Sequence, residues 1–287
     1  GLLQTVLGVH RDRQVLHYQR ETFVRWWARR SAGRKLGTGK KAALFAGCLV
    51  NYQATDVGKA TVQVLEKNGV EVALPDQSCC GMPSFDIGDT AAMVAAAERT
   101  IASLKSWVDQ GYDVVIPTPS CSLMVKREYV SLVAGDEAKR VAEHTYDISE
   151  YLMKMKREGG LALDFTQKPG RVAYQVPCHL RDQNIGFKSK ELMECAGAKV
   201  EVIEKCSGHD GSWSAKVEFF PLSMKIAQKA VRMVEQAPAD LVASDCPLAG
   251  LQLDQAGAVA HAGGKSSQHP IQIVRDAYGL PRDPRAS

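Results

Sequence analysis

The chain has 287 residues, is 45% hydrophobic and has a formal net charge of +4. A chain of this length can bury two ordinary hydrophobic cores, so we expect two domains. No apolar run approaches the roughly 20 residues of a membrane-spanning helix, and no signal-peptide pattern is visible. These features argue against an integral membrane protein and predict a cytoplasmic one.

The first segment, residues 1–40, is basic and is predicted to be a helical arm. Ten lysines and arginines lie between Arg11 and Lys41 against two acidic residues. Trp26 and Trp27 belong to the apolar face of an amphipathic helix, which we expect to pack on the body of the protein. Docking to a partner subunit and peripheral contact with the inner face of a membrane are the alternatives. Nucleic-acid binding is not expected, because no known nucleic-acid module is present.

Between residues 41 and 158 strands alternate with helices, which predicts a mostly parallel sheet covered by helices. The predicted strands are Ala42–Ala46, Val70–Leu74 and Asp113–Ile116. The predicted helices are Thr55–Asn68, Thr90–Gln110, Ser122–Val133 and Ala138–Lys156. Cysteines follow all three strands, at the strand ends where ligands of parallel sheets collect.

Residues 159–170 are predicted to be a linker, and residues 171–287 a second domain of the same kind that ends in a helix. Its predicted strands and helices are Arg171–Val176, Lys188–Ala196, Lys199–Ile203, Leu222–Gln236, Asp240–Ala243 and Ile271–Tyr278. Cysteines follow these three strands too, about 130 residues after their counterparts, and Gly208 matches Gly81. The expected fold is therefore α/β, with two pseudo-repeated domains, each a mostly parallel sheet flanked by helices, and an N-terminal helical arm.

The eight cysteines are too sparse for a disulfide scaffold and are typical of metal ligands or redox centres. The first candidate site consists of Cys48, Cys79, Cys80 and Cys121. The adjacent thiols of Cys79 and Cys80 can serve one site only if a turn or a cofactor of several atoms meets both. Thiolates select iron–sulfur clusters, zinc or copper(I), and the wide spacing along the chain favours a cluster. A zinc site and a disulfide between Cys79 and Cys80 are the alternatives.

The second candidate site consists of Cys178, Cys206 and Cys246. Ser207 stands where the first site has Cys80, so one thiolate is missing. His209 is the candidate fourth ligand, and His179 and Asp210 are close enough in sequence to serve instead. A modified iron–sulfur cluster or a single iron or zinc ion suits such a donor set. The alternative is that this half has lost its metal and these residues are polar packing at a turn.

These motifs resemble the duplicated cysteine-rich "CCG" domain. That domain occurs in the cysteine-rich subunit of heterodisulfide reductase, the glycolate oxidase iron–sulfur subunit, the lactate-utilisation iron–sulfur protein and the iron–sulfur subunit of anaerobic glycerol-3-phosphate dehydrogenase. The resemblance covers roughly Lys41 to Leu253 and rests on Cys79-Cys80-Gly81, Pro177-Cys178-His179 and Asp245-Cys246. It implies a [4Fe–4S] cluster, non-cubane in the heterodisulfide reductase branch, in each half, although one half holds zinc in some members. By position, the implied ligands are Cys48, Cys79, Cys80 and Cys121, then Cys178, Cys206 and Cys246.

The same resemblance implies an iron–sulfur electron-transfer protein, a subunit or fragment of a cytoplasmic oxidoreductase. Its expected redox partner is a dehydrogenase subunit, a ferredoxin-like domain or a rubrerythrin-like protein, and a quinone is a candidate acceptor. A cluster-based disulfide or thiol reductase and a zinc-binding structural scaffold are the alternatives. No nucleophile–base arrangement stands out and Gly-x-Gly-x-x-Gly is absent, so we assign no catalytic side chain and expect the cluster to carry the chemistry.

Overall fold

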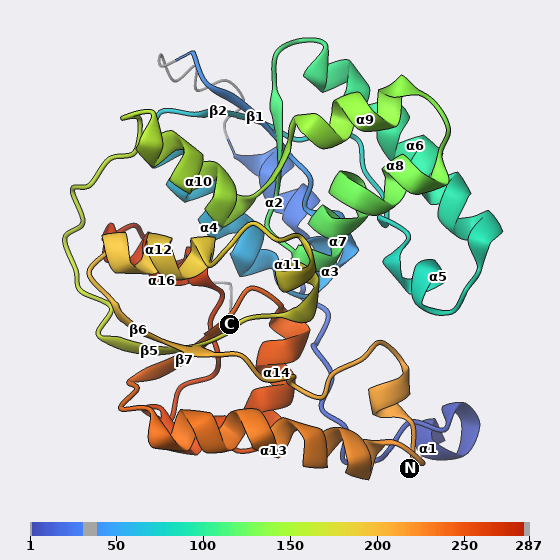
Figure 1. Ribbon diagram of the computed structural model, residues 1–287, viewed down its shortest axis with the longest axis vertical. Coiled ribbons are helices and arrows are strands. Elements are labelled where there is room, and N and C mark those ends of the chain that lie inside the picture. Colours follow the sequence, from blue (N-terminus) through green and yellow to red (C-terminus); the bar gives the residue numbers. More distant parts are fainter. Residues whose placement is uncertain (1, 31–38, 284–287) are drawn as a thin grey trace.

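Seven strands form two separate parallel sheets in the computed structural model, which describes residues 2–30 and 39–283 (Figure 1). The first sheet has the order β2-β1-β3-β4 and the second the order β6-β5-β7. The strands are β1 (Lys41–Leu44), β2 (Glu71–Ala73), β3 (Asp113–Ile116), β4 (Thr145–Asp147), β5 (Arg171–Gln175), β6 (Lys199–Ile203) and β7 (Leu241–Ser244). The α/β fold prediction is confirmed.

The two sheets share one internal order, because the first strand of each half lies between the second and the third. Ala43 of β1 pairs in parallel with Ala73 of β2 and Val114 of β3. Ala173 of β5 pairs in the same way with Glu201 and Val242. The chain therefore reverses its direction of winding beside β1 and beside β5, and such switch points are where open parallel sheets bind ligands.

The helices of the first half cover both faces of its sheet. They are α3 (Gly47–Tyr52), α4 (Thr55–Lys67), α5 (Met82–Asp86), α6 (Thr90–Val108), α7 (Pro119–Leu123), the π-helical turn η1 (Met124–Glu128), α8 (Tyr129–Leu132), α9 (Asp136–Glu143) and α10 (Ile148–Arg157). The single helix expected over Ala138–Lys156 is wrong, because β4 interrupts it. Asp147 ends this strand and caps α10 together with Glu150 in a capping box, which restarts the helix.

The second half repeats this arrangement with fewer helices between its third strand and its last helix. Its helices are α11 (Cys178–Asp182), α12 (Lys188–Cys195), the 3₁₀ turn η2 (Trp213–Ala215), α13 (Phe220–Gln236), α14 (Pro247–Gln255), α15 (Ala258–His261) and α16 (Pro270–Ala277). A single parallel bridge between Ala243 and Gln268 stands where the first half has β4. His269 then caps α16 in a capping box, as Asp147 caps α10. The duplication therefore extends to the last helix.

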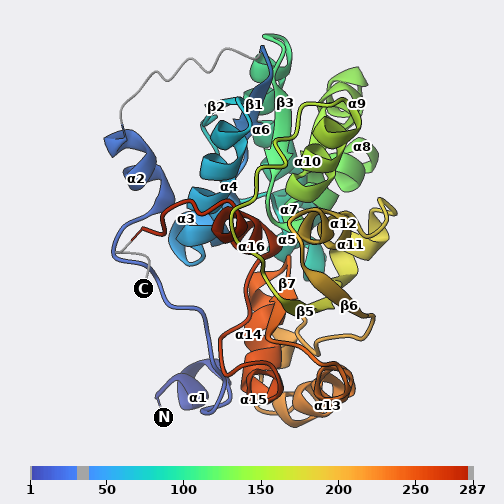
Figure 2. The ribbon, with the colours of Figure 1, turned by 90° about the vertical axis from the view of Figure 1, so that its left-hand side faces the viewer.

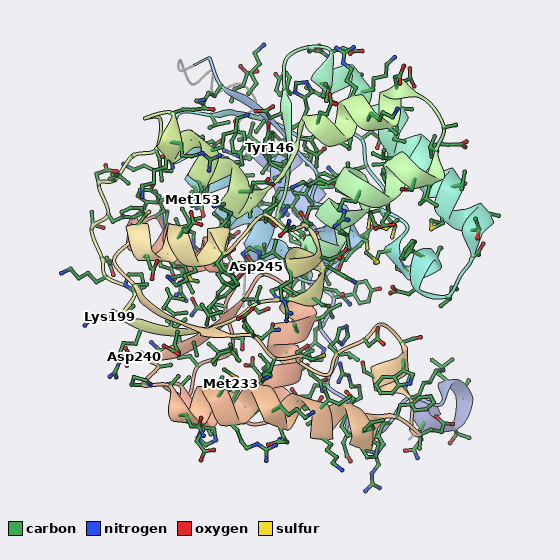
Figure 3. The ribbon with its side chains drawn as sticks, in the orientation of Figure 1. Tyr146, Met153, Lys199, Met233, Asp240 and Asp245 are labelled. Atoms are coloured by element: carbon green, nitrogen blue, oxygen red, sulfur yellow. The ribbon has the colours of Figure 1, made fainter. Side chains whose placement is uncertain are left out.

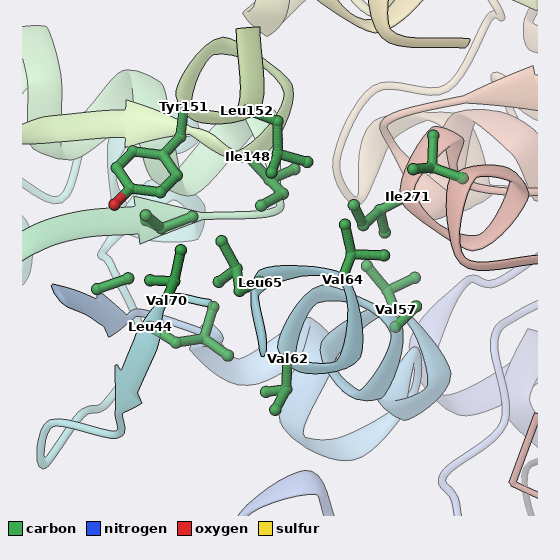
Figure 4. Close-up of a cluster of buried hydrophobic side chains, with 14 of the residues drawn as sticks. Leu44, Val57, Val62, Val64, Leu65, Val70, Ile148, Tyr151, Leu152 and Ile271 are labelled. Atoms are coloured by element: carbon green, nitrogen blue, oxygen red, sulfur yellow. The ribbon is translucent and has the colours of Figure 1, made fainter. Parts of the chain in front are cut away.

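The two halves interlock through their last helices. Helix α16 packs against α4 of the first half, and α10 packs against α12 of the second. The fully buried Arg275 of α16 pairs with Asp56 of α4 at 2.7 Å. One apolar cluster spans this interface and includes Leu65, Leu152 and Ile271 (Figure 4). The last helix of each half thus completes the core of the other half.

A buried polar cluster lies in the same interface, near the middle of the molecule (Figure 3). Asp245 is inaccessible to solvent and accepts hydrogen bonds from the Tyr174 hydroxyl, at 2.5 Å, and from the Ser189 hydroxyl. Ser189 also contacts Ser149 of α10 at 2.9 Å. These bonds join β5, β7, α10 and α12 and satisfy polar groups that would otherwise be costly to bury.

The N-terminal arm contains α1 (Leu2–Leu7), α2 (Phe23–Arg29) and, between them, the strap of residues 8–22 (Figure 2). The strap runs along one side of the molecule from the second half to the first. It is held by backbone contacts, such as the bridge between Val9 and Lys216. The expected helical arm is therefore confirmed at α1 and α2 but wrong for the strap, and its residues 31–38 lie outside the described part of the chain. Helix α2 buries Phe23 on the body. Among the described residues, no helix is both long and apolar enough to cross a bilayer.

Candidate metal centre

The structure brings the first four candidate cysteines together at the carboxyl edge of the first sheet. Cys48 lies in α3 directly after β1, the pair Cys79 and Cys80 follows β2, and Cys121 lies in α7 after β3. The Sγ atoms of Cys48 and Cys79 are 3.9 Å apart. The thiol of Cys80 lies close enough to those of Cys79 and Cys121 to shift the pKa of both. We call this group the first sulfur site.

Hydrogen bonding within the first sulfur site makes two of its thiols easy to deprotonate. The bonds from Cys48 and then Cys80 hold the pKa of Cys79 far below its usual range. The bond with Cys80 likewise lowers the pKa of Cys121. Cys80 and Cys121 are buried whereas Cys48 is exposed, so one side of the site is shielded from solvent and its outer edge is open to it. The same contacts raise the pKa of Cys48 and Cys80, so two of the four thiols lose a proton easily and two do not. Metals bind the thiolate form, which Cys79 and Cys121 reach most readily.

Two residues outside the paired cysteines, Gln77 and Tyr129, hold the first sulfur site in shape. Gln77 Oε1 accepts from the backbone N–H groups of Ala46, at 2.6 Å, and Gly47, at 3.0 Å, which ties the two cysteine loops together. The buried Tyr129 hydroxyl donates to the carbonyl of Cys80 at 2.7 Å. Sequence reasoning missed Gln77 and Tyr129. The only available signal was the place of Gln77, two residues before the paired cysteines.

Gly47 is required because the chain passes close to a sulfur atom there. Its φ is +65°, in the left-handed region that favours glycine. A Cβ atom at this position would lie 3.1 Å from the Sγ atom of Cys121. The glycine therefore lets the loop after β1 press against the thiol that follows β3.

The second sulfur site consists of Cys178, Cys206 and Cys246 at the carboxyl edge of the second sheet. Cys178 opens α11, Cys206 follows β6, and Cys246 is the N-cap of α14. Partial burial, and then the nearby Cys206 and Asp210, raise the pKa of the Cys178 thiol. Burial raises the pKa of Cys246 to about 11, and Cys178 is among the groups near it. Cys178 thus lies in electrostatic range of both other thiols, and Cys178 and Cys206 are exposed.

Ser207 occupies the place of Cys80 in an otherwise equivalent turn. Gly81 and Gly208, which follow, have φ of +86° and +80°. Each is pressed against the next long helix: an added Cβ would lie 3.1 Å from Ala96 Cβ at Gly81, and 2.3 Å from the carbonyl oxygen of Ser223 at Gly208. Ser207 is buried, as Cys80 is. The duplication has therefore kept the turn and replaced one sulfur by oxygen.

The candidate ligands other than cysteine have contacts of their own. His209 Nδ1 lies 3.0 Å from Arg13 Nη2 of the strap, and burial lowers the pKa of this imidazole to about 4. His179 Nδ1 lies 2.8 Å from the hydroxyl of Ser120, in the first half. Asp210 is exposed at the surface.

The two sulfur sites lie on either side of one helix contact. Helix α11, which begins with Cys178, packs against α7, which carries Cys121. Besides the bond between Ser120 and His179, the Gln183 amide donates to the Ser122 hydroxyl at 2.8 Å. A cysteine of each sulfur site is therefore adjacent in sequence to a residue that hydrogen-bonds across the two halves: Cys121 to Ser120, and Cys178 to His179.

Four neighbouring thiols, which follow three different strands, fit a group that presents several metal atoms to them. Across residues 2–30 and 39–283, no three Cys, His, Asp or Glu side chains have the close arrangement that a single metal ion requires. The eight cysteines, all within these ranges, are free thiols. Cys195, which sequence reasoning interprets as a core thiol, is only half-buried and lies 2.9 Å from Lys156 Nζ, away from both sulfur sites.

Comparison with known proteins finds relatives that match most of this chain. Lactate utilization protein A of Geobacillus thermodenitrificans is 31% identical to this chain over 253 residues, which cover 84% of this chain and 98% of that protein. One subunit of the anaerobic glycerol-3-phosphate dehydrogenase of Escherichia coli K12, the one designated C, is 28% identical over 280 residues, 96% of this chain and 68% of that protein. A solved structure of a hypothetical protein from Helicobacter pylori is similar at a TM-score of 0.49 and 12% identity, over 96% of this chain and 53% of that one.

The family described as "Cysteine-rich domain" (CCG) matches this chain twice, over residues 42–126 and 172–254. The first match includes β1 to β3 with the first sulfur site, and the second includes β5 to β7 with the second sulfur site. Both matches thus coincide with the duplicated parts of the fold. The chain belongs to the cysteine-rich CCG domain family and carries two copies of its domain.

Proposed function

We propose that the chain is an iron–sulfur electron-transfer subunit, or part of one, of a cytoplasmic oxidoreductase. The observation that carries the proposal is the meeting of Cys48, Cys79, Cys80 and Cys121 at the switch point of the first sheet. These thiols would hold a [4Fe–4S]-type cluster, which supplies one-electron chemistry when bound. Cys178, Cys206 and Cys246 would hold a second centre, either a modified cluster or, if these thiols approach one another more closely than in this structure, a single iron or zinc ion.

The protein's own groups would set the properties of the first centre. Buried Cys80 and Cys121 shield its inner side from water, and exposed Cys48 gives it an edge at the surface where a partner can approach. Gln77 and Tyr129 hold the ligand loops at fixed separation. A cluster with one shielded side and one exposed side suits electron exchange with a docked protein.

The relatives support a dehydrogenase or another oxidoreductase as the partner. One is named for lactate utilization, and another is part of a glycerol-3-phosphate dehydrogenase. Both names point to the oxidation of small hydroxylated metabolites. We infer that this chain receives electrons from such a dehydrogenase, directly or through a ferredoxin-like domain, and passes them to an acceptor such as a quinone.

The exposure of Cys48 favours one second candidate, a disulfide or thiol reductase. A substrate sulfur could reach the outer edge of the first sulfur site, where the neighbouring Cys79 has a lowered pKa. This interpretation predicts reduction of a disulfide substrate that is lost in Cys48→Ala.

The test is to purify the chain without oxygen and to measure iron, zinc and acid-labile sulfide together with electron paramagnetic resonance. We expect a brown protein whose iron and sulfide fall sharply in Cys121→Ala. Cys195→Ala is the matched control, because this thiol lies outside both sulfur sites, and it should keep its full content. Colourless protein with stoichiometric zinc would instead identify a zinc scaffold and overturn the proposal.

A further inference from the structure

Two adjoining cavities lie where the two halves of the molecule meet. The first has a volume of about 310 Å³ and lies between the strap, the start of α4 and helix α14. The second has a volume of about 390 Å³ and continues beside α16. Their walls share five residues: Asp56, Ser266, Ser267, Gln268 and Gln272. No cysteine is among the described residues that line them, so these cavities are separate from both sulfur sites.

The second cavity has an excess of positive charge. Three cations line it, Lys265, Arg275 and Arg282, against the single carboxylate of Asp56. Asp276 lies outside this wall and pairs with both arginines. Three cations against two carboxylates leave a net charge of +1, and Lys265 forms no ion pair with any described residue. Such a wall attracts an anion.

Arg275 offers a hydrogen-bond donor to this cavity although only 1% of it is exposed. Its Nη1 atom donates to Asp56 at 2.7 Å, and its Nε atom donates to Asp276 at 3.1 Å. Its Nη2 atom has no hydrogen-bond partner within residues 2–30 and 39–283, and it is not sealed from solvent as the unsatisfied Nη1 atom of Arg30 is. Because a guanidinium group has donors only, Nη2 suits a ligand oxygen.

The carboxylates in the two walls already have donors from the protein. Asp56 accepts from Arg275 and also from the Gln272 amide at 2.6 Å. Asp254, in the first cavity, accepts from both the N–H and the hydroxyl of Ser267. Helix α4 begins in this cavity with Ala54 as its N-cap and has no side-chain cap. The start of a helix favours negative charge, so the first cavity also suits an anionic molecule.

We propose that the two cavities form one binding site for a small organic oxyanion, whose phosphate or carboxylate group binds Arg275 and Lys265 and whose polar remainder lies under the strap beside the start of α4. Cavities of a few hundred Å³ are typical of small-molecule sites. Because the walls come from both halves, the bound anion stabilises their contact in the folded chain. The site does not depend on iron at either sulfur site.

The first test asks whether the second cavity binds an oxyanion. Inorganic phosphate and, in parallel, glycolate are titrated by calorimetry into the whole chain, purified without oxygen. We expect saturable binding with a Kd of about 1 mM for at least one of them, and the tighter of the two identifies the charged group of the ligand. Saturable binding of neither anion would overturn the proposal.

The matched variants for this test are two exposed lysines. Lys265→Gln should weaken binding of the anion about three- to tenfold, because it removes one charged donor. Lys229→Gln, on α13, makes the same change of charge at an exposed position far along the chain from the cavity lining and should leave the Kd unchanged. Equal weakening in both variants would attribute the binding to net charge and would refute the site.

A blocking variant tests the site without breaking the ion pair between Arg275 and Asp56. Ser266 is exposed and lines both cavities, so Ser266→Glu places a negative charge in the site. We expect the anion to bind at least about tenfold more weakly, because like charges repel. Ser131→Glu, at an exposed position of α8, is the control and should bind as the wild-type chain does. Unchanged binding in Ser266→Glu would contradict the proposal.

The last test asks whether the ligand extends under the strap. 3-Phosphoglycerate should bind about tenfold more tightly than inorganic phosphate, because its remainder gains contacts in the first cavity. Leu251→Phe narrows that cavity and should remove this gain while phosphate still binds. Equal affinity of the two ligands for the wild-type chain would refute the part under the strap. Anion binding by a chain without iron would refute the proposed function alone, and iron without anion binding would refute this inference alone.

Discussion

The two sulfur sites occupy the same place on two sheets of the same order, yet they differ in how many thiols they offer. Both have a cysteine after each of three strands, and in both a left-handed glycine closes the turn after β2 or β6. The first site adds the buried thiol of Cys80, and the second has the hydroxyl of Ser207 at that point. The scaffold of the turn and the donor set that it carries can therefore change independently.

The loops around the two sites are held by different glutamines. In the first half Gln77, in the loop after β2, bonds to the loop after β1. In the second half Gln175, at the end of β5, donates to the carbonyl of Lys205 in the loop after β6, at 3.1 Å. In each half a glutamine amide therefore joins the loops after the first and the second strand. The glutamine lies after the second strand in the first half and at the end of the first strand in the second half. The geometry of the cysteine loops, more than the residue that maintains it, is what the two copies share.

The largest effect should come from adding a methyl group to the shared turn. In Gly208→Ala the new Cβ would lie 2.3 Å from the Ser223 carbonyl at a φ of +80°, so we expect a loss of about 3 to 5 kcal/mol of unfolding free energy. In Gly81→Ala the nearest atom is a methyl group at 3.1 Å, and the loss should be about 1 to 3 kcal/mol. Denaturant unfolding measures both.

The control for these variants is Gly264→Ala. Its φ is +71° but nothing lies within 4 Å of the added Cβ, so only the backbone strain of about 1 kcal/mol should remain. Equal losses in Gly208→Ala and Gly81→Ala would mean that α13 can move away, and the second turn would then be no tighter than the first.

The next effect concerns the first sulfur site alone. Gly47→Ala places a methyl group 3.1 Å from Cys121 Sγ, so it should lower the iron bound at this site and destabilise the chain by about 1 to 3 kcal/mol. Gly88→Ala has a similar φ, +74°, with open space around it, and should keep its iron. The iron-to-protein ratio of the two variants is the measurement. A fall of equal size in both would attribute the loss to backbone strain instead of contact with the sulfur.

Local patterns predicted every strand except β4 and placed a cysteine after three strands in each half, because short apolar runs followed by cysteines are visible in sequence. They could not predict β4, whose three residues are part of a helical pattern and are extended only because they pair with β3. The extended strap could not be predicted for a related reason. Its backbone hydrogen bonds go to distant parts of the chain, such as that from Gln19 to Tyr52, and they leave no repeating pattern of apolar residues in the sequence. The contact of Arg13 with His209 depends on that docking. Tertiary bonds of this kind have no local signature.

The equivalent helix caps Asp147 and His269 should give opposite pH dependences. Burial, and then Asp245, raise the pKa of Asp147 to about 8, and its Oδ2 atom has no hydrogen-bond partner in the described part of the chain. Its contribution to stability is complete below the unfolded pKa of about 4 and is lost as the pH rises through 8. Asp147→Asn should remove this decline, which is about 1.4 kcal/mol for each pH unit between the unfolded and the folded pKa, since the amide keeps the cap.

Burial lowers the pKa of His269, so its contribution is present above the unfolded pKa of about 6.5 and is lost as the pH falls through the folded value. His269→Asn should therefore flatten the acid side of the stability profile and leave the alkaline side unchanged. Urea midpoints measured across this pH range for the two variants test both expectations. A profile that Asp147→Asn leaves unaltered would show that the carboxyl is ionised in the folded chain.

The smallest effect should be the coupling between the two sites across α7 and α11. Ser120 precedes Cys121 and His179 follows Cys178, and the hydrogen bond of 2.8 Å between their side chains crosses between the halves. A double-mutant cycle of Ser120→Ala and His179→Ala should give a coupling of about 0.5 to 1.5 kcal/mol in unfolding free energy, the usual value of one partly buried hydrogen bond. Both single variants should keep the iron of the first sulfur site, because neither side chain is a thiol of that site. A coupling near zero, with Ser189→Ala still destabilising, would mean that the interlocked last helices hold the halves together and that the sulfur sites lie side by side without supporting each other.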